Sequence, residues 1–330
     1  MLKSRKAVSA LKHLVKLPTA ICGEALAIAS VGNLLGGYSS FFRIFCGVVA
    51  LALLFFFTLK IFFCRDYFLD EIRDINVLSI FPTYFMGLMV LSTYIRASFG
   101  GISVGAIVCA FAFAGHLSVT LFFSWRHLRH VSADTIMPNW FIVYVAYALG
   151  AVFASYYGFF TIGKGIVTVA LASYSVLFPM VFYRLLVVGR IPDKLLPAIW
   201  LVNSPINICI VAYIASFSVI NGLFLAVLLF FSILSFVVSV WYVDIRRVLK
   251  NGFAPTWSAF TFPSIIFVVA LQNTFNYFYG GKVYLYVDLF FAGLEIAAAA
   301  IVFLILLLFL RYLRIEVPEV ITHDDALCGK

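Results

Sequence analysis

The sequence has 330 residues, of which 64% are hydrophobic and only 11% are charged. Soluble globular domains carry about 45–50% apolar and about 25% charged residues, so this composition excludes a water-soluble enzyme and a disordered chain. The formal net charge of +9 would suggest a nucleic-acid partner in a soluble protein, but here the basic residues lie between apolar stretches. We therefore expect an all-α integral membrane protein that lies in a lipid bilayer and binds no nucleic acid.

Ten apolar stretches have the length of roughly 20 residues that a membrane-spanning helix needs. They cover residues 17–37, 41–63, 76–96, 101–125, 139–160, 165–188, 196–219, 222–243, 255–279 and 284–312. With the N-terminus in the cytoplasm, all of the 23 Lys and Arg residues fall on the inner side except Arg43, Arg96, Lys164 and Lys282. Basic residues are enriched in cytoplasmic loops. The pattern predicts a multi-pass protein of the cell (plasma or inner) membrane with both termini in the cytoplasm.

This topology divides the chain into three parts. Residues 1–16 form a basic cytoplasmic segment, residues 17–314 a ten-helix transmembrane pore domain, and residues 315–330 a cytoplasmic tail. A cleaved signal peptide is disfavoured, because Pro18 opens the first apolar stretch and Glu24 interrupts it. The six cysteines have no ligand spacing and are expected to be buried as small apolar side chains, so no metal or other cofactor is predicted.

A proline lies at or near the start of every odd-numbered stretch. The five prolines are Pro18, Pro82, Pro138, Pro197 and Pro255, and they recur at intervals of about 60 residues, which is typical of a repeated unit. Proline is tolerated in the first turn of a helix, where its missing N–H group would have no intrahelical partner. The repeat predicts ten transmembrane helices arranged as five helical hairpins.

The two helices of each predicted hairpin differ in polarity. The seventh stretch contains Asn203 and Asn207, whereas the eighth consists almost entirely of Leu, Phe and Val. Polar side chains are costly in lipid and face protein or water instead. We therefore expect the odd-numbered helices on the inside, the even-numbered helices on the outside, and a central pore along the axis.

Three short motifs carry a resemblance to a known family: residues 17–19 (LPT) followed by Gly23, residues 81–83 (FPT), and residues 257–263 (WSAFTFP). The chain resembles the tellurite-resistance/dicarboxylate transporter (TDT) family, which includes bacterial tellurite-resistance proteins, fungal malate and sulfite transporters and plant slow-type anion channels. The resemblance implies five hairpins around a pore and a homotrimer with one pore per subunit. It also implies a gate at the phenylalanine of the Thr-Phe-Pro segment, which is Phe262.

The sequence around Phe262 is compatible with this role. Pro263 follows it inside the ninth stretch, and a proline within a helix removes one hydrogen bond and kinks the helix. Such a kink would turn a neighbouring ring toward the axis, where a hydrophobic constriction closes a channel by excluding water. The alternative is that Phe262 is one of 37 phenylalanines that pack between helices.

Two carboxyl groups fall within membrane-spanning stretches. Glu24 lies near the start of the first stretch, where the channel members of the family have an uncharged residue, and Glu295 lies near the middle of the tenth. An ionisable residue at this depth indicates a functional site, and both residues could carry a proton coupled to anion movement. The alternative is that each is a protonated carboxyl group that hydrogen-bonds between helices.

Amides and outer cations complete the predicted pore. The pore-lining candidates, besides Glu24 and Pro263, are Asn203, Asn207, Gln272, Asn273 and Asn276. Their N–H groups could replace part of the hydration shell of an anion, or they could form hydrogen bonds between helices. The four outer cations, Arg43, Arg96, Lys164 and Lys282, would form a basic collar that concentrates anions at the pore mouth, or they could simply extend to the lipid headgroups.

We interpret the chain as a channel for small anions such as chloride, nitrate or carboxylates, with no catalytic residues. The alternative is a proton-coupled transporter of C4-dicarboxylates (malate-type) or of oxyanions such as tellurite or sulfite. An integral membrane prenyltransferase is a less favoured alternative, since Asp66, Asp70 and Asp74 resemble half of a magnesium-pyrophosphate site. Such a site needs a second acidic cluster on a facing loop, but Asp134, Asp193 and Asp244 are isolated. Arg65, Glu71 and Arg73 around the first three aspartates are typical of a solvated loop.

Overall fold

The computed structural model describes residues 14–99, 102–189, 191–280 and 284–319, and these contain helices but no strand. Eight helices in this part of the chain are long and apolar enough to cross a membrane. They span Ser40–Phe63, Ile75–Ile95, Val104–His127, Phe160–Val188, Asp193–Ser216, Gly222–Tyr242, Pro255–Tyr279 and Leu285–Arg314. Two further apolar helices are shorter and span Ile21–Leu35 and Ala146–Tyr156.

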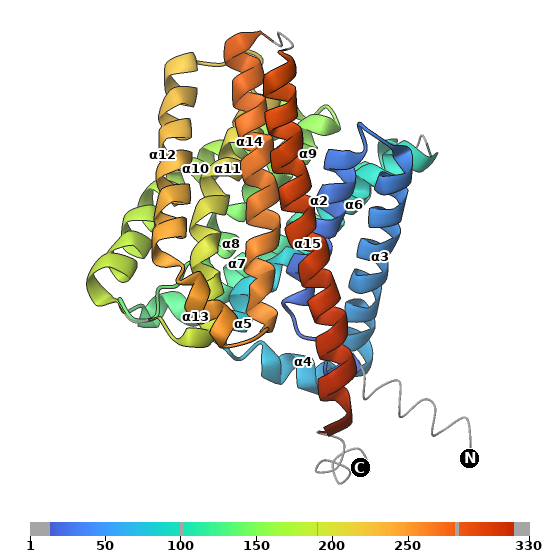
Figure 1. Ribbon diagram of the computed structural model, residues 1–330, viewed down its shortest axis with the longest axis vertical. Helices are drawn as coiled ribbons and strands as arrows, with labels where there is room; N and C mark the ends of the chain where they lie inside the picture. The colour runs from blue at the N-terminus through green and yellow to red at the C-terminus, as the bar shows by residue number, and fades with distance from the viewer. Residues whose placement is uncertain (1–13, 100–101, 190, 281–283, 320–330) are drawn as a thin grey trace.

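The long helices run side by side, and the short helices α4, α5 and α13 lie at one end of the molecule (Figure 1). The regular helices from α2 to α9 are α2 (Ile21–Leu35), α3 (Ser40–Phe63), α4 (Arg65–Glu71), α5 (Ile75–Ile80), α6 (Pro82–Phe99), α7 (Ile102–His127), α8 (Trp140–Tyr144) and α9 (Leu149–Tyr156). The remaining ones are α10 (Phe160–Tyr183), α11 (Ser204–Ser216), α12 (Gly222–Tyr242), α13 (Ile245–Lys250), α14 (Thr261–Tyr279) and α15 (Leu285–Glu319). We call the end that carries α4, α5 and α13 the α4 end.

Short 3₁₀ segments lie between several of the regular helices. They are η1 (Leu128–His130), η2 (Ala146–Ala148), η4 (Asp193–Asn203) and η5 (Pro255–Phe260), while η3 (Arg184–Val188) is a π-helical turn after α10. Two of the ten stretches predicted from hydropathy, residues 17–37 and 139–160, therefore do not form one long helix. In the first, residues 17–20 are turns around Pro18, and in the second the helix stops between α8 and α9.

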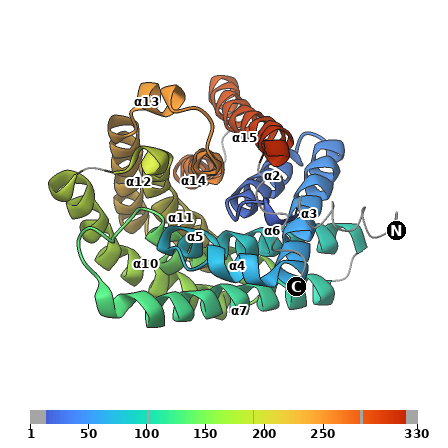
Figure 2. The same cartoon turned by 90° about the horizontal axis from the view of Figure 1, so that it is seen from below.

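Five helical segments contact one another in a closed circuit: α2 packs on α6, α6 on α9, α9 on α11, α11 on α14, and α14 on α2. Helices α3, α7, α10, α12 and α15 lie at the periphery, as the view from below shows (Figure 2). Burial follows this division, because 89% of an apolar 18-residue stretch within Asp193–Ser216 is buried, compared with 28% of such a stretch within Gly222–Tyr242. The more polar helix of this pair is thus the inner one, as its sequence predicts.

The tenth helix continues beyond its predicted end. Helix α15 runs to Glu319, so its last turn extends into the segment interpreted as the C-terminal tail. Residues 1–13 and 320–330, which make up most of the two predicted cytoplasmic segments, lie outside the described residues.

Candidate functional site

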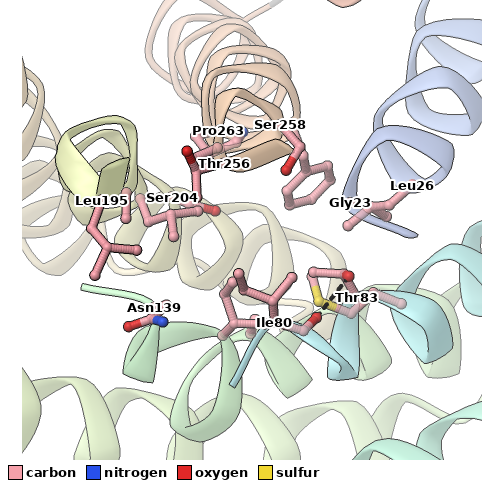
Figure 3. Close-up of a pocket in the computed structure, with 17 residues that line it drawn as sticks. Gly23, Leu26, Ile80, Thr83, Asn139, Leu195, Ser204, Thr256, Ser258 and Pro263 are labelled. Carbon is pink, nitrogen blue, oxygen red and sulfur yellow. Dashed lines mark hydrogen bonds between the residues drawn. The ribbon is translucent and has the colours of Figure 1, made fainter. Parts of the chain in front are cut away.

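A cavity lies inside the circuit of inner helices, and we call it the axial cavity. A water-sized sphere can be centred in about 50 Å³ of it, and the empty space within its outline, including open solvent at its mouth, is about 620 Å³. We count each inner helix together with the short segments before it (α5 before α6, α8 and η2 before α9, η4 before α11, η5 before α14) as one inner segment. All five inner segments contribute to its wall, with the residues Gly23, Leu26, Ile80, Thr83, Met86, Asn139, Ile142, Ala146, Leu195, Ala198, Leu201, Ser204, Thr256, Ser258, Ala259, Phe262 and Pro263. Figure 3 shows these side chains arranged around the open space. Because the inner segments begin at the α4 end, the cavity occupies that half of the molecule.

The wall of the axial cavity is neutral, since none of its 17 residues is charged. Its polar groups are five hydroxyl or amide side chains. Thr83 Oγ1 donates to the carbonyl of Ile80 (2.8 Å), and Thr256 Oγ1 donates to the carbonyl of Lys194 (2.7 Å). The Asn139 amide donates to Asn76 at 3.3 Å. The hydroxyl protons of Thr83 and Thr256 are thus already donated to backbone carbonyls, and the wall is mainly apolar without a fixed charge that would trap a small ion.

Phe262 is among the last residues, in chain order, that the inner segments contribute to the wall of the axial cavity, and we call this part of the wall its inner end. Phe262 is 7% exposed, and with Pro263 it is the last residue of its segment on the cavity wall. The chain changes here from the 3₁₀ segment η5 to helix α14, and Thr261 Oγ1 donates to the carbonyl of Ser258 (2.7 Å). Phe260, two residues earlier, faces Trp200 instead, with ring centroids 5.8 Å apart. Of the two rings, only that of Phe262 lines the cavity.

A family model described as SLAC1, voltage-dependent anion channel, matches residues 15–313. The chain belongs to this family. Its members are channels and transporters of the TDT group, so the resemblance seen in the proline-centred motifs is confirmed and anion transport through a membrane protein is supported. No curated protein matches the chain. The matched range contains every residue of the axial cavity.

Glu24 lies behind the cavity wall of this SLAC1-family chain. Its neighbours Gly23 and Leu26 line the cavity, whereas Glu24 does not. Its side chain is fully buried, and neither carboxylate oxygen has a hydrogen-bond partner among the described residues. Successive helical residues point about 100° apart, so Glu24 points into the protein beside the cavity rather than into it.

The two asparagines of the seventh stretch lie against an outer helix. Asn207 donates to the side-chain oxygen of Asn203 (3.1 Å) and accepts from Ser232 of α12 (2.7 Å). Both asparagines are fully buried, and Asn203 Nδ2 has no partner among the described residues. Ser204 lines the axial cavity but neither asparagine does. Their hydrogen bonds join the inner segment to α12.

The polar residues near the far end of α14 and α15 form another contact between helices. Gln272 donates to Glu295, which is buried in α15. Asn273 is half-buried, while Asn276 and Asp288 are exposed. None of these residues lines the axial cavity, which lies toward the other end of the molecule.

Two of the four predicted collar residues have described side chains. Arg43 donates to the carbonyl of Thr93 (3.2 Å) and lies over the ring of Tyr94, and Lys164 lies over the ring of Phe217. Lys282 lies outside the described residues, as does the side chain of Arg96. Arg43 and Lys164 both occur in the first turns of outer helices, at the end opposite α4.

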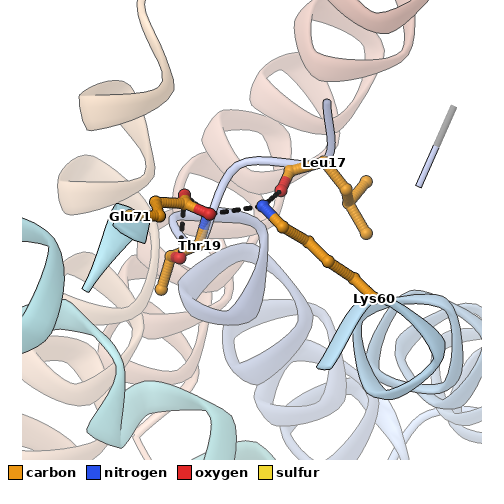
Figure 4. Close-up of polar contacts among 4 residues, drawn as sticks. All are labelled: Leu17, Thr19, Lys60 and Glu71. Carbon is orange, nitrogen blue, oxygen red and sulfur yellow. Dashed lines mark hydrogen bonds and ion pairs between the residues drawn. The ribbon is translucent and has the colours of Figure 1, made fainter. Parts of the chain in front are cut away.

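A buried ion pair at the α4 end was not expected from the sequence (Figure 4). Lys60, which is 2% exposed, pairs with Glu71 of α4 and donates to the carbonyl of Leu17 (2.6 Å). Glu71 also accepts from the backbone N–H (3.1 Å) and the hydroxyl (2.9 Å) of Thr19. Glu71 is therefore not simply part of a solvated loop. The cluster fixes the turn before α2, the helix that brings Gly23 and Leu26 to the cavity.

Most polar residues of the cavity wall were not among the predicted pore-lining residues, although three of them have a common position in the sequence. Thr83, Asn139 and Thr256 each directly follow one of the repeated prolines. The proline fixes the start of an inner segment, so the next residue lies at the same level in each repeat. A polar residue after the proline therefore indicates the cavity wall in three of the five repeats; Pro197 is followed by Ala198, and Pro18 by Thr19, which binds Glu71 instead.

Proposed function

We propose that this protein is a channel for small anions, with a conduction path along the axis enclosed by the five inner segments and blocked at Phe262. The observation that carries the proposal is the axial cavity, because every inner segment contributes to it and Phe262 lies at its inner end. Phe262 is buried and shares the cavity wall with the apolar residues Leu26, Met86 and Ala146, and an apolar constriction at this ring would exclude water and ions. The neutral wall of the axial cavity fits a path for chloride or nitrate better than a binding site for one highly charged substrate.

We further propose that the ten helical segments cross the membrane as five hairpins. The closed circuit of contacts among the inner segments supports this arrangement, as does the proline repeat. In the proposed orientation the α4 end faces the cytoplasm, where most basic residues then lie. A homotrimer with one path per subunit, and a collar of Arg43, Arg96, Lys164 and Lys282 that attracts anions at the outer mouth, complete the proposal.

The orientation predicts which surface positions are accessible from outside the cell. Single cysteines replacing Gly37 or Val219, at the end opposite α4, react with a membrane-impermeant thiol reagent added to intact cells. Cysteines replacing Ser132 or Asn251 react only after the membrane is permeabilised. All four positions are exposed, so access to the protein surface does not limit the reaction. A complete exchange of the two groups would reverse the orientation, and a mixture would contradict the ten-segment topology.

Glu24 favours a second function, a proton-coupled anion transporter, because it is a buried carboxyl group beside the axial cavity. Purified protein in liposomes separates the two functions. A channel moves chloride or nitrate down its own gradient whether or not a pH gradient is present. A coupled transporter requires the pH gradient for uptake against the anion gradient.

Replacing Glu24 with glutamine removes the ionisable group while keeping its size. For the channel we expect an anion flux within about twofold of the original, since an isosteric amide costs little when the carboxyl is uncharged. Loss of pH-driven uptake with retained anion exchange would instead establish Glu24 as the proton carrier and replace the channel by the transporter. Asp288→Asn is the matched control, because it makes the same acid-to-amide change at an exposed residue away from the axial cavity.

A further inference from the structure

The inner segment that contains α8, η2 and α9 is interrupted within the cavity wall. The last hydrogen bond of α8 runs from the N–H of Val145 to the carbonyl of Phe141 (3.0 Å). Val145 then leaves the helical conformation, with φ −129° and ψ −35°, and the chain passes through η2 before α9 begins at Leu149. Carbonyl groups at such a break lose their helical donors, and lipid offers no replacement.

Two side chains of the neighbouring outer helix supply the missing donors. His116 Nε2 lies 3.1 Å from the carbonyl oxygen of Ile142. Thr120 Oγ1 lies 2.9 Å from that of Val143, closer than to the carbonyl oxygen of His116 in its own helix (3.1 Å). The carbonyls of Ile142 and Val143 are those that follow Phe141 in the interrupted helix. His116 is fully buried, and its ring donates only if Nε2 carries the proton. Residues four apart share a face of a helix, so α7 presents both donors to the break.

The same face of α7 makes a third contact one turn further on. Ser124 Oγ lies 3.0 Å from the hydroxyl of Tyr144, the last residue of α8. The His116 and Tyr147 rings also meet edge to face, with centroids 6.2 Å apart. The interruption is thus held from both sides of Val145 by groups that do not themselves line the cavity.

The interruption lies where the wall approaches the proposed constriction. Ile142 and Ala146 line the axial cavity on either side of Val145. Ala146 is the last residue of its segment on the wall, as Phe262 and Pro263 are of theirs. We propose that His116 and Thr120 are positioning residues for conduction, because they hold this break and thereby set the position of Ile142 and Ala146 opposite Phe262.

This inference rests on the proposed channel and deepens it. Without the two donors, the carbonyls of Ile142 and Val143 can be satisfied by closing the break into a continuous α-helix. Closure would turn Ala146 and the residues after it about the helix axis. The width and lining of the path beside Phe262 would then change, although no residue of the path has been replaced.

Variants of the two donors test the inference in a Phe262→Ala background, where current is measurable. His116→Leu and Thr120→Val remove one donor each at similar size, and His116→Gln restores an N–H group near the position of Nε2. Thr168→Val is the matched control, because the Thr168 hydroxyl lies on an exposed face of α10 and donates only to its own helix, to the carbonyl of Lys164 (2.8 Å).

The readout is the nitrate-to-chloride permeability ratio, taken from the reversal potential, which does not depend on how many channels fold. We expect His116→Leu and Thr120→Val to change the ratio about threefold or more, a change on the scale of one lost hydrogen bond. His116→Gln restores the original ratio, and Thr168→Val leaves it unchanged. An unaltered ratio in both donor variants, or an equal change in Thr168→Val, would overturn the positioning role.

A second measurement does not depend on conduction. Ala146→Cys in a cysteine-free chain reports the local position through its rate of reaction with a water-soluble thiol reagent. Adding His116→Leu is expected to change this rate about threefold or more, whereas adding Thr168→Val is not; equal rates would contradict the inference. If Phe262→Ala protein carries no anion current, the proposed channel fails, and the labelling rates alone still decide whether His116 positions Ala146.

Discussion

Replacing Phe262 with alanine raises the anion conductance of the reconstituted protein about 10- to 100-fold. The ring lies at the inner end of the axial cavity and is 7% exposed, so its removal lowers both the steric and the dewetting barrier at one point. A free-energy barrier that is lower by about 1.4–2.7 kcal/mol corresponds to a 10- to 100-fold higher rate of ion passage. Selectivity for anions over cations is retained, because the wall and the outer cations are unchanged. Planar-bilayer recording with chloride or nitrate measures both quantities.

Phe260→Ala is the control for this prediction. Phe260 packs against Trp200 and Trp257 and does not line the axial cavity. Its loss therefore lowers thermal stability without raising conductance. An equal rise in both variants, at matched amounts of protein in the membrane, would show that loosened packing rather than an opened gate admits the ions.

Replacing Lys60 with methionine lowers the free energy of unfolding by about 3 kcal/mol. The change leaves Glu71 without its ion pair and the carbonyl of Leu17 without its donor, and breaking a buried ion pair on one side costs about 3–5 kcal/mol. The lower end applies because Glu71 is 24% exposed and keeps its hydrogen bonds to Thr19. Thermal unfolding of the detergent-solubilised protein measures the effect.

Arg73→Met provides the comparison for an exposed pair. Arg73 lies 3.2 Å from Asp70 with both side chains well exposed, and such pairs contribute about 0–1 kcal/mol.

Adding Glu71→Gln to Lys60→Met removes the unpaired carboxylate and recovers part of the stability. Equal losses in Lys60→Met and Arg73→Met would refute the role of the cluster in fixing the start of α2.

Much of the fold follows from the sequence because hydropathy acts over whole helices. The long apolar stretches appear as helices, and the polar seventh stretch is buried while the Leu- and Phe-rich eighth is exposed. The interruption at Val145 could not be foreseen in the same way. The donors that stabilise it, His116 and Thr120, precede it by more than 20 residues, and only the packing of α7 on α8 brings them to the two free carbonyls.

In the candidate site, too, some residues follow from the sequence and others only from the packing of the helices. Phe262 was identified by a resemblance in its motif, and the structure places it on the cavity wall. Asn203 and Asn207 were equally polar candidates, but their partner is Ser232 of an outer helix. An amide on an inner helix satisfies its hydrogen bonds wherever a partner lies, and sequence periodicity does not separate the face toward the axis from the face toward the outer helix.

The central claim is that anions pass through the axial cavity. The most direct test is Thr83→Cys in a cysteine-free Phe262→Ala channel, exposed to a charged methanethiosulfonate reagent from the α4 end. Thr83 lies on the cavity wall, so its modification should abolish the anion current. The same reagent at Ser132→Cys, on an exposed loop, should leave the current unchanged. Full labelling of Cys at position 83 with an unaltered current would contradict the account.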